Sequence, residues 1–195
     1  MIKRLLDIFF SLIGILVLSP LFFIFSILII ADSGLPIFYL QTRVGKREKH
    51  FSLFKFRTMR KHSDKEGLLT IGKDPRITSF GGFLRKYKMD ELPQLFNVLI
   101  GDMSLVGPRP ELKKYVDMYN EEQKKVLSIK PGITDYASIE YAQENEIIAK
   151  ADNPEQLYIK EIMPAKLKLN LKYINEQNFF TDLKIIIKTI GKVLS

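Results

Sequence analysis

The chain has 195 residues, which suffices for one ordinary domain or for a small domain plus an anchor. Of these residues 46% are apolar and 27% charged, a composition that excludes a disordered chain. Its 30 basic and 22 acidic residues give a net charge of +8, which favours an anionic partner: nucleic acid, a phospholipid surface or a phosphorylated substrate. The absence of cysteine excludes a disulfide framework, a thiolate metal site and a cysteine nucleophile. Two histidines, His50 and His62, argue against a multi-histidine metal site or a Ser–His triad.

An uncharged segment runs from Ile8 to Ala31, between Asp7 and Asp32. As one helix its roughly 24 residues extend about 36 Å, against roughly 30 Å for the hydrocarbon core of a bilayer. A cleavable signal peptide has a shorter apolar region, about 7–15 residues, that ends in small residues, and residues 29–32 lack such an end. The segment is therefore predicted to be a membrane helix.

The middle of this segment is Ser19-Pro20, where the proline predicts a kink. Basic residues stand on both sides of the segment: Lys3, Arg4, Arg43, Lys46, Arg47 and Lys49. Because cytoplasmic flanks carry the Lys/Arg excess, these flanks suit a helical hairpin that enters and leaves on one face, while a kinked spanning helix is the alternative. Either arrangement predicts a cytoplasmic C-terminal body.

Residues 41–59 predict two short strands around a basic turn at residues 45–49. The period of two places Lys55 and Arg57 on one face, and Phe54 and Phe56 on the other, toward a core. Two neighbouring cations favour a phosphate site, and a solvated basic strand is the alternative.

After a polar loop expected at residues 62–74, residues 78–86 predict a short helix with a basic end. A second helix is expected to start near Asp90, because Pro93 fits only a first turn, and to end at Gly101. Its predicted buried face consists of Leu92, Leu95, Phe96 and Leu99. Beyond it we expect helices over residues 111–127 and 142–151 and from residue 154, and a turn at Pro131-Gly132.

Residues 179–194 predict an amphipathic helix. Lys184, Lys188 and Lys192 stack at intervals of four residues, opposite an apolar side that includes Phe180, Leu183, Ile186, Ile187 and Ile190. This pattern fits a helix that lies on an anionic membrane surface. It fits equally a terminal helix that closes the core and leaves its lysines in solvent.

The pattern richest in chemistry is Asp90-Glu91 at a predicted helix start, with Arg85 before it and Arg109 after it. Free amides, the helix dipole and nearby cations favour an ionised carboxylate there. An ionised aspartate can attack phosphorus, and an oxygen-rich site can hold Mg²⁺. The structural alternative is an ordinary N-terminal cap followed by an exposed glutamate.

Residues 89–111, MDELPQLFNVLIGDMSLVGPRPE, closely resemble the signature of the bacterial sugar transferases, the small monotopic phosphoglycosyl transferases. Further segments match in order, so that the resemblance covers essentially the whole chain: residues 3–7, Ser19-Pro20, and residues 54–59, 130–134 and 182–186. The resemblance implies an enzyme that moves a sugar-1-phosphate from a UDP-sugar to undecaprenyl phosphate and releases UMP.

The resemblance also implies roles for particular residues. Asp90 matches the nucleophile that holds the phospho-sugar covalently and, with the donor diphosphate, contacts Mg²⁺, while Glu91 matches a proton acceptor or organiser. Matching basic positions, expected to bind phosphates or the uridine end, are Lys55, Arg57, Arg85 and Arg109.

The fold implied is α+β and mostly helical. Residues 1–31 form a re-entrant membrane helix broken at Ser19-Pro20, and residues 32–195 form a cytoplasmic catalytic domain with a small β-hairpin and interfacial helices. The protein is then monotopic in the bacterial inner membrane, with anionic phospholipid and no nucleic acid as partners. A non-catalytic basic membrane scaffold is the competing hypothesis.

The chain departs from the family pattern at residues 135–141 and at Asn170. Residues 135–141 read DYASIEY where many relatives continue GWAQVNG, and we expect this segment to bear on sugar selectivity. Asn170 stands where many relatives carry aspartate and is assigned no role.

Overall fold

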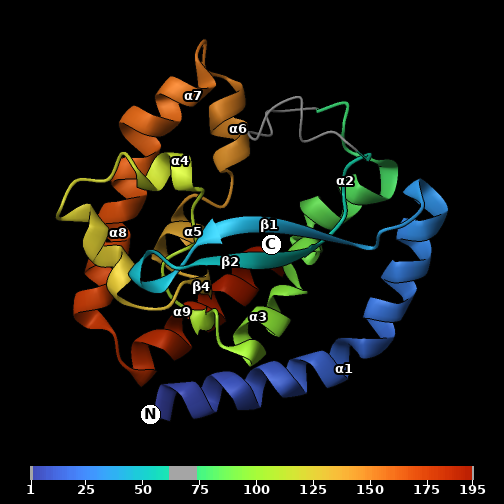
Figure 1. The fold of residues 1–195 in the computed structure, drawn as a ribbon, viewed down its shortest axis with the longest axis horizontal. Helices are drawn as coiled ribbons and strands as arrows, with labels where there is room; N and C mark the ends of the chain where they lie inside the picture. The colour runs from blue at the N-terminus through green and yellow to red at the C-terminus, as the bar shows by residue number, and fades with distance from the viewer. Residues whose placement is uncertain (1, 62–73, 195) are drawn as a thin grey trace.

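The computed structural model describes residues 2–61 and 74–194 (Figure 1). The fold is α+β and mostly helical, as the sequence predicts, and it contains two small sheets. Its first half contains α1 (Ile2–Ser33), β1 (Phe38–Val44), η1 (Lys46–Glu48), β2 (His50–Phe56), α2 (Ser79–Lys86), η3 (Met89–Glu91), α3 (Gln94–Ile100) and β3 (Ser104–Val106). Its second half contains α4 (Lys113–Val116), η4 (Gln123–Ser128), β4 (Gly132–Thr134), α5 (Tyr136–Glu140), α6 (Glu144–Ala149), α7 (Pro154–Leu157), η5 (Tyr158–Ile162), α8 (Met163–Glu176) and α9 (Phe179–Leu194).

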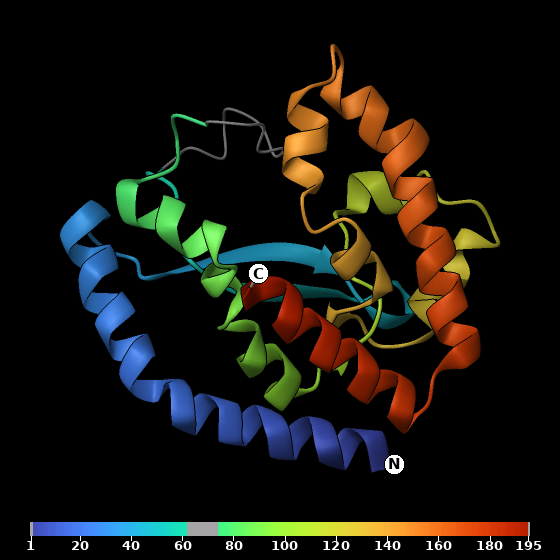
Figure 2. The ribbon, with the colours of Figure 1, turned by 180° about the vertical axis from the view of Figure 1, so that it is seen from behind.

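Helix α1 is long and apolar enough to cross a membrane, by length and composition. It bends near its middle, where Pro20 lies, and its two halves run in different directions along the body (Figures 1 and 2). Pro20 has no N–H for the Leu16 carbonyl four residues earlier, and the Ser19 hydroxyl donates to that carbonyl at 2.8 Å. The predicted kink is therefore a bend within one continuous helix.

Both halves of α1 are fastened to the body. In the first half, the Arg4 guanidinium donates to two carbonyl groups in the last turn of α3, at 2.5 and 2.9 Å. The buried Asp7 carboxylate accepts from the Ser104 hydroxyl at 3.1 Å and from the next backbone amide at 3.0 Å. In the second half, Phe25 and Ile29 pack into a cluster with β2 and α2. Many of the other apolar side chains of α1 are exposed.

Strands β1 and β2 form the predicted antiparallel hairpin, with Phe38 opposite Phe56 and Val44 opposite His50. The first strand begins three residues before the predicted segment, at Phe38 rather than Gln41. Phe56 is buried against Phe25 and Leu84, so the hairpin joins α1 to α2 in one apolar cluster. The hairpin thereby fixes β2, which carries Lys55, on the body.

The predicted helix start near Asp90 is wrong. Lys88 adopts a left-handed φ of 56°, Asp90 lies in the short 3-10 turn η3, and α3 begins only at Gln94, after Pro93. Gly101, at φ 110°, ends α3 as expected. The predicted apolar face is only half-buried, because the fully buried face of α3 is polar and consists of Gln94 and Asn97 with Val98.

Asn97 explains this rotation of α3. Its side chain accepts from the Phe54 amide at 2.9 Å and donates to the Ser52 carbonyl at 2.7 Å, so it pairs with the open edge of β2. Meanwhile Leu95 and Phe96 turn toward α1, where they approach Gly14 and the Phe22 ring. The spacing of apolar residues in a sequence does not predict a buried amide side chain of this kind.

The second sheet was not predicted from the sequence. β3 and β4 pair in parallel, with Ser104 opposite Gly132 and Val106 opposite Thr134, so the expected turn at Pro131-Gly132 is the start of a strand. Gly132 lies against the backbone of Gly107, where a Cβ atom would clash. The sheet thus brings the segment after β3 beside the segment after β4.

The long helix predicted over residues 111–127 is also wrong, since only α4 and η4 form there. The Glu111 carbonyl accepts from the Val44 amide at 2.9 Å, which holds the chain extended beside β1. Asn120 and Gln123 then exchange side-chain and backbone hydrogen bonds of 2.9 Å each, a reciprocal cap that starts a new turn.

The C-terminal helices agree with the sequence. α6 and α7 lie within the expected segments, and α7 continues through the wide turn η5 into α8. α9 is amphipathic and fits both of the alternatives left open: Ile185 is fully buried, whereas Phe180, Leu183, Ile187 and Ile190 are exposed. The loop expected at residues 62–74 lies, apart from Asp74, outside the described residues.

Two neighbouring glycines of α2 give a test of this packing. A Cβ atom on Gly81 would lie closer than 3.0 Å to the backbone of Thr58, whereas one on the exposed Gly82 would meet nothing nearer than Ile77 at 4.0 Å. We expect Gly81→Ala to destabilise the fold by about 1–3 kcal/mol and lower Tm by several degrees. Gly82→Ala should be neutral or stabilising by up to about 1 kcal/mol. Thermal unfolding in detergent measures both, and equal Tm values would contradict the close approach.

Candidate active site

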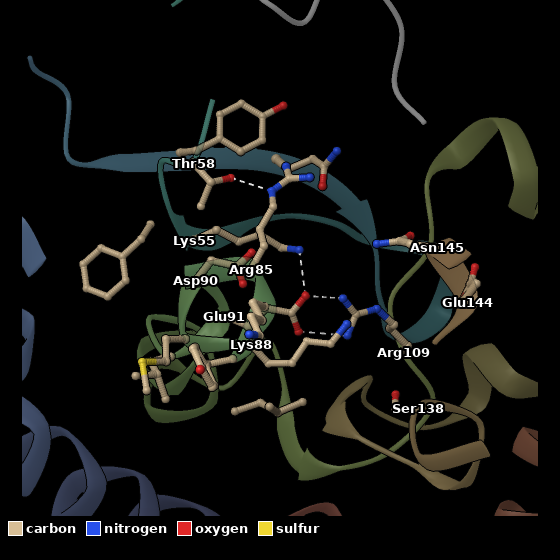
Figure 3. Close-up of a pocket in the computed structure, with 18 of the residues that line it drawn as sticks. Lys55, Thr58, Arg85, Lys88, Asp90, Glu91, Arg109, Ser138, Glu144 and Asn145 are labelled. Carbon is tan, nitrogen blue, oxygen red and sulfur yellow. Dashed lines mark hydrogen bonds and ion pairs between the residues drawn. The ribbon is translucent and has the colours of Figure 1, made fainter. Parts of the chain in front are cut away.

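A wide pocket opens between the hairpin, α2, η3 and the segments that follow β3 and β4 (Figure 3). Of the residues expected at a site, Lys55 enters it from β2, Arg85 from α2, Asp90 and Glu91 from η3, and Arg109 from the loop after β3. Segments distant in sequence therefore bring cations around two adjacent carboxylates. Since such charges attract phosphate groups, the pocket suits an anionic substrate.

Glu91 is tied to two of these cations. Its carboxylate accepts from Lys55 Nζ at 3.0 Å and from Arg109 Nη1 at 2.9 Å, and Arg109 Nη2 makes a second, shorter contact (Figure 3). Burial alone would raise the pKa of Glu91, but the charges and hydrogen bonds of Arg109 and Lys55 hold this pKa well below its usual range. Glu91 is thus a fixed anion.

Asp90 behaves differently although it is the next residue. It is 8% exposed, and its carboxylate makes no hydrogen bond or ion pair with another residue of the described ranges. Burial and then the negative charge of Glu91 raise the pKa of Asp90, against the smaller opposing effects of Lys55, Arg85 and Arg109. The sequence predicted that a helix terminus and nearby cations favour the ionised form of Asp90, and this prediction is corrected in two respects. Asp90 lies in η3, before the start of α3, and the effect of burial on its pKa outweighs that of the cations.

The basic residues are held in different ways. Lys55 is half-buried, and its loss of solvent lowers its pKa even though Glu91 opposes that effect. Arg85 Nε donates to the Thr58 hydroxyl at 2.8 Å, which directs its guanidinium along the pocket wall (Figure 3). Glu91 raises the pKa of Arg109 above its ordinary value, so Arg109 remains a permanent cation.

Arg57 borders the pocket but turns toward the end of α1. Its Nη2 donates to the Ser33 carbonyl and hydroxyl at 2.9 and 2.8 Å, and to the Gly34 carbonyl. The predicted shared face with Lys55 fails because β2 ends at Phe56, one residue earlier. Arg57 Nε and Nη1 are buried without a hydrogen-bond partner in the part of the chain that the structure describes.

Several pocket residues were missed by the sequence reasoning. Ser138, Glu144 and Asn145 line the side next to Arg109 (Figure 3). Lys166 pairs with Glu144 at 2.7 Å. Asp135, which precedes them, is fully buried. The available signal was the departure from the family pattern at residues 135–141, which marks this wall of the pocket.

The donor set fits Mg²⁺ only together with a substrate. Within residues 2–61 and 74–194, no group of three or more His, Cys, Asp and Glu side chains could hold a metal ion. Mg²⁺ commonly takes one or two carboxylates and completes its shell with water and substrate phosphates. Asp90 can supply one such ligand because its carboxylate is unengaged, whereas Glu91 is occupied by Lys55 and Arg109.

The different environments of Asp90 and Glu91 suit two different chemical roles. The cations fix Glu91 as an anion, which then directs the side chains of Lys55 and Arg109, while Asp90 keeps its oxygens for another partner. Environments that push the pKa values of two titratable groups apart are the usual basis of distinct catalytic roles. The arrangement therefore suits a nucleophilic Asp90 beside an organising Glu91.

Opposite pKa shifts predict opposite effects on stability. The lowered pKa of Glu91 means that its ionised form stabilises the fold above the unfolded-state pKa near 4.5, so Glu91→Gln should cost about 3 kcal/mol at pH 7. This loss should shrink as pH falls below about 4.5 toward the folded-state pKa. The raised pKa of Asp90 means that its charge destabilises the fold at pH 7, so Asp90→Asn should keep or raise Tm. Tm measured against pH tests both signs, and a lower Tm for Asp90→Asn at pH 7 would contradict the second.

Comparison with known proteins places this chain in a family. The profile of the "Bacterial sugar transferase" family matches residues 1–195. The uncharacterized sugar transferase EpsL of Bacillus subtilis is 39% identical over 194 residues, which cover 99% of this chain and 87% of that protein.

Two longer relatives carry more specific names. The UDP-N-acetylgalactosamine-undecaprenyl-phosphate N-acetylgalactosaminephosphotransferase of Aeromonas hydrophila is 36% identical over 198 residues, which cover 100% of this chain and 44% of that protein. The UDP-glucose:undecaprenyl-phosphate glucose-1-phosphate transferase of Escherichia coli is 33% identical over 196 residues, or 98% and 40% of the two chains. Because the family profile and the EpsL alignment both extend over essentially the whole chain, this protein belongs to the bacterial sugar transferase family.

Proposed function

We propose that this protein transfers a sugar-1-phosphate from a UDP-sugar to undecaprenyl phosphate and releases UMP. This would be the first membrane step of glycan assembly, in O-antigen, capsule, exopolysaccharide or glycoprotein synthesis. The names of the Aeromonas and Escherichia relatives support the reaction class and differ in the sugar, so the proposal covers UDP-sugars as a class. The observation that carries it is the unengaged Asp90 carboxylate beside a Glu91 fixed by Lys55 and Arg109.

The proposed reaction has two displacements at one phosphorus atom. In the first, an Asp90 oxygen attacks the β-phosphorus of the UDP-sugar, the bond to the bridging oxygen breaks, and UMP leaves with that oxygen and its electron pair. In the second, a phosphate oxygen of undecaprenyl phosphate attacks the same phosphorus and releases the Asp90 carboxylate. The product carries its sugar on a diphosphate, and both charges and atoms balance.

The surrounding residues supply positioning and charge. We assign Lys55, Arg85 and Arg109 to the phosphates or the uridine end of the donor, since they converge around the two carboxylates. Arg57 borders the same pocket and keeps its place in this proposal, but its buried Nε and Nη1 could reach a phosphate oxygen only after its guanidinium turns away from the end of α1. Glu91 would orient the cations, and its low pKa argues against the alternative role as proton acceptor in the second transfer.

Mg²⁺ would be the cofactor, with Asp90 as its protein ligand and the donor diphosphate supplying the others. Bound there, it would neutralise part of the diphosphate charge. Lys55, Arg85 and Arg109 line the same pocket and would neutralise the same charge. Their task is to bind and orient the substrate before the displacement begins.

In this proposal, binding to the membrane positions the site for both substrates. We propose that residues 1–31 form a re-entrant helix and that residues 32–195 form a catalytic domain on the cytoplasmic face of the bacterial inner membrane. The exposed apolar row of α9 and the exposed face of α1 would contact anionic phospholipid there. Since the donor is soluble and the acceptor phosphate lies at the bilayer surface, this placement brings both to Asp90.

The nucleophile is tested by Asp90→Asn. We expect UMP release from a UDP-sugar, with Mg²⁺ and undecaprenyl phosphate present, to fall at least about 10³-fold, because a carboxamide does not form the acyl phosphate that holds the phospho-sugar. The matched control is Asp117→Asn, since Asp117 is an exposed partner of Lys113 outside the pocket, and it should keep wild-type turnover.

Labelled sugar-phosphate should become trapped on the wild-type protein when the acceptor is omitted, and on Asp117→Asn, but not on Asp90→Asn. Full turnover by Asp90→Asn would remove it as the nucleophile. Binding of anionic vesicles without UMP release from any sugar in a broad UDP-sugar panel would favour the scaffold hypothesis.

The re-entrant helix is tested by single cysteines, because the chain has no native thiol. Lys3→Cys and Lys49→Cys precede and follow the apolar segment. In inside-out membrane vesicles, an impermeant thiol reagent should label both positions, and in right-side-out vesicles neither. Labelling of the two positions from opposite sides would instead establish a spanning helix.

A further inference from the structure

Asp135 is a buried carboxylate that the proposed reaction leaves without a role. It lies between β4 and α5 and is fully inaccessible to solvent. Its Oδ1 accepts from the Ser138 amide at 2.6 Å, which caps the start of α5, and its Oδ2 accepts from the Arg109 amide at 3.1 Å. One side chain therefore joins the loop after β4 to the loop after β3.

The backbone amide of Arg109, which Asp135 binds, lies between two prolines. Arg109 stands between Pro108 and Pro110, and proline has no backbone N–H, so Arg109 provides the only amide hydrogen of that tripeptide. The prolines restrict the backbone but donate nothing that could hold it to the body. Asp135 accepts the one donor that this segment can offer.

The same segment is fastened at its other end by the second sheet. The Gly107 amide donates to the Thr134 carbonyl at 3.0 Å, and the Gly132 amide donates to the Pro108 carbonyl at 3.0 Å. With the contact from Asp135, the chain from Gly107 to Arg109 is held to β4 and α5 at successive points. The Arg109 side chain therefore starts from a fixed backbone when it reaches Glu91.

We propose that Asp135 is a positioning residue that holds the Arg109 guanidinium on Glu91 and in register with the substrate phosphates. An ordinary helix cap uses one oxygen, whereas Asp135 uses both, and the second is directed at the residue that pairs with Glu91. The part that concerns substrate rests on the proposed function. The part that concerns the backbone of Arg109 does not.

The contact itself is tested by hydrogen exchange in Asp135→Ser. Serine is also a preferred helix cap, but its single, shorter hydroxyl cannot reach both amides, so this variant should keep α5 and lose the contact with Arg109. Deuterium uptake is followed by mass spectrometry in short peptides that contain Pro108-Arg109-Pro110. Within this tripeptide, Arg109 has the only amide that exchanges. We expect uptake there to be about tenfold faster or more than in the wild type. Unchanged uptake overturns the proposal.

The consequence for turnover is tested by a double-mutant cycle of Asp135→Ser with Arg109→Gln. Asp135→Ser should lower kcat/KM for UMP release by about 10- to 100-fold, mainly through a higher KM for the UDP-sugar. In the Arg109→Gln background, the same change should alter kcat/KM less than about twofold. UDP affinity, measured by calorimetry in the same four proteins, gives a parallel cycle that needs no turnover. Equal losses in both backgrounds overturn the proposal, because they indicate a general structural role.

The control is another helix cap. Asn153 caps α7 by accepting from the Gln156 amide at 3.0 Å and lies outside the pocket, so Asn153→Ser should leave kcat/KM and Arg109 exchange unchanged. If Asp135→Ser does not fold, Asp135→Asn takes its place, since its one carbonyl oxygen can serve only one of the two amides. A wild-type protein that releases no UMP contradicts the proposed function, while the exchange comparison still decides whether Asp135 holds Arg109.

Discussion

The interaction on which the site depends is the pairing of Glu91 with Arg109 and Lys55. Two adjacent carboxylates with little access to solvent repel each other, and the cations reduce this repulsion by binding one of them. Glu91 becomes the anion that the fold requires, and Asp90 is left with a raised pKa and unengaged oxygens. The chemistry proposed for Asp90 is thus a consequence of the charge balance achieved at its neighbour.

The remainder of the fold brings these groups together from separate segments. β2 supplies Lys55, η3 supplies the carboxylates, and the loop after β3 supplies Arg109. Asn97 joins α3 to the edge of β2, and the contact of Gly107 with Gly132 joins β3 to β4. These are backbone and amide contacts, which have strict geometry, so they hold the charged side chains to a narrow set of positions.

Sequence reasoning found what local patterns encode. The hairpin, α2, the end of α3 at Gly101, α9 and most of the charged pocket follow from alternation, capping residues and the run around Asp90. It failed where distant contacts decide the structure. The three-residue strands β3 and β4 are too short to show a period, Asn97 is buried only because β2 lies beside it, and Arg57 turns to the end of α1 because β2 stops at Phe56. The helix break at Asn120 was visible in principle, since Asn120 and Gln123 have the spacing of a reciprocal cap.

The hydroxyl of Ser19, the residue before Pro20, makes the bend of α1 compatible with a hydrocarbon environment. In water, a carbonyl deprived of its amide partner is simply hydrated, but hydrocarbon offers no such donor, and an unmatched polar group there costs roughly 2–7 kcal/mol. Because the Ser19 hydroxyl already serves the Leu16 carbonyl, the helix can change direction without exposing a bare acceptor to lipid tails. Ser19 and Pro20 therefore act together: the proline bends the helix axis, and the serine hydroxyl satisfies the carbonyl that the bend leaves without an amide donor.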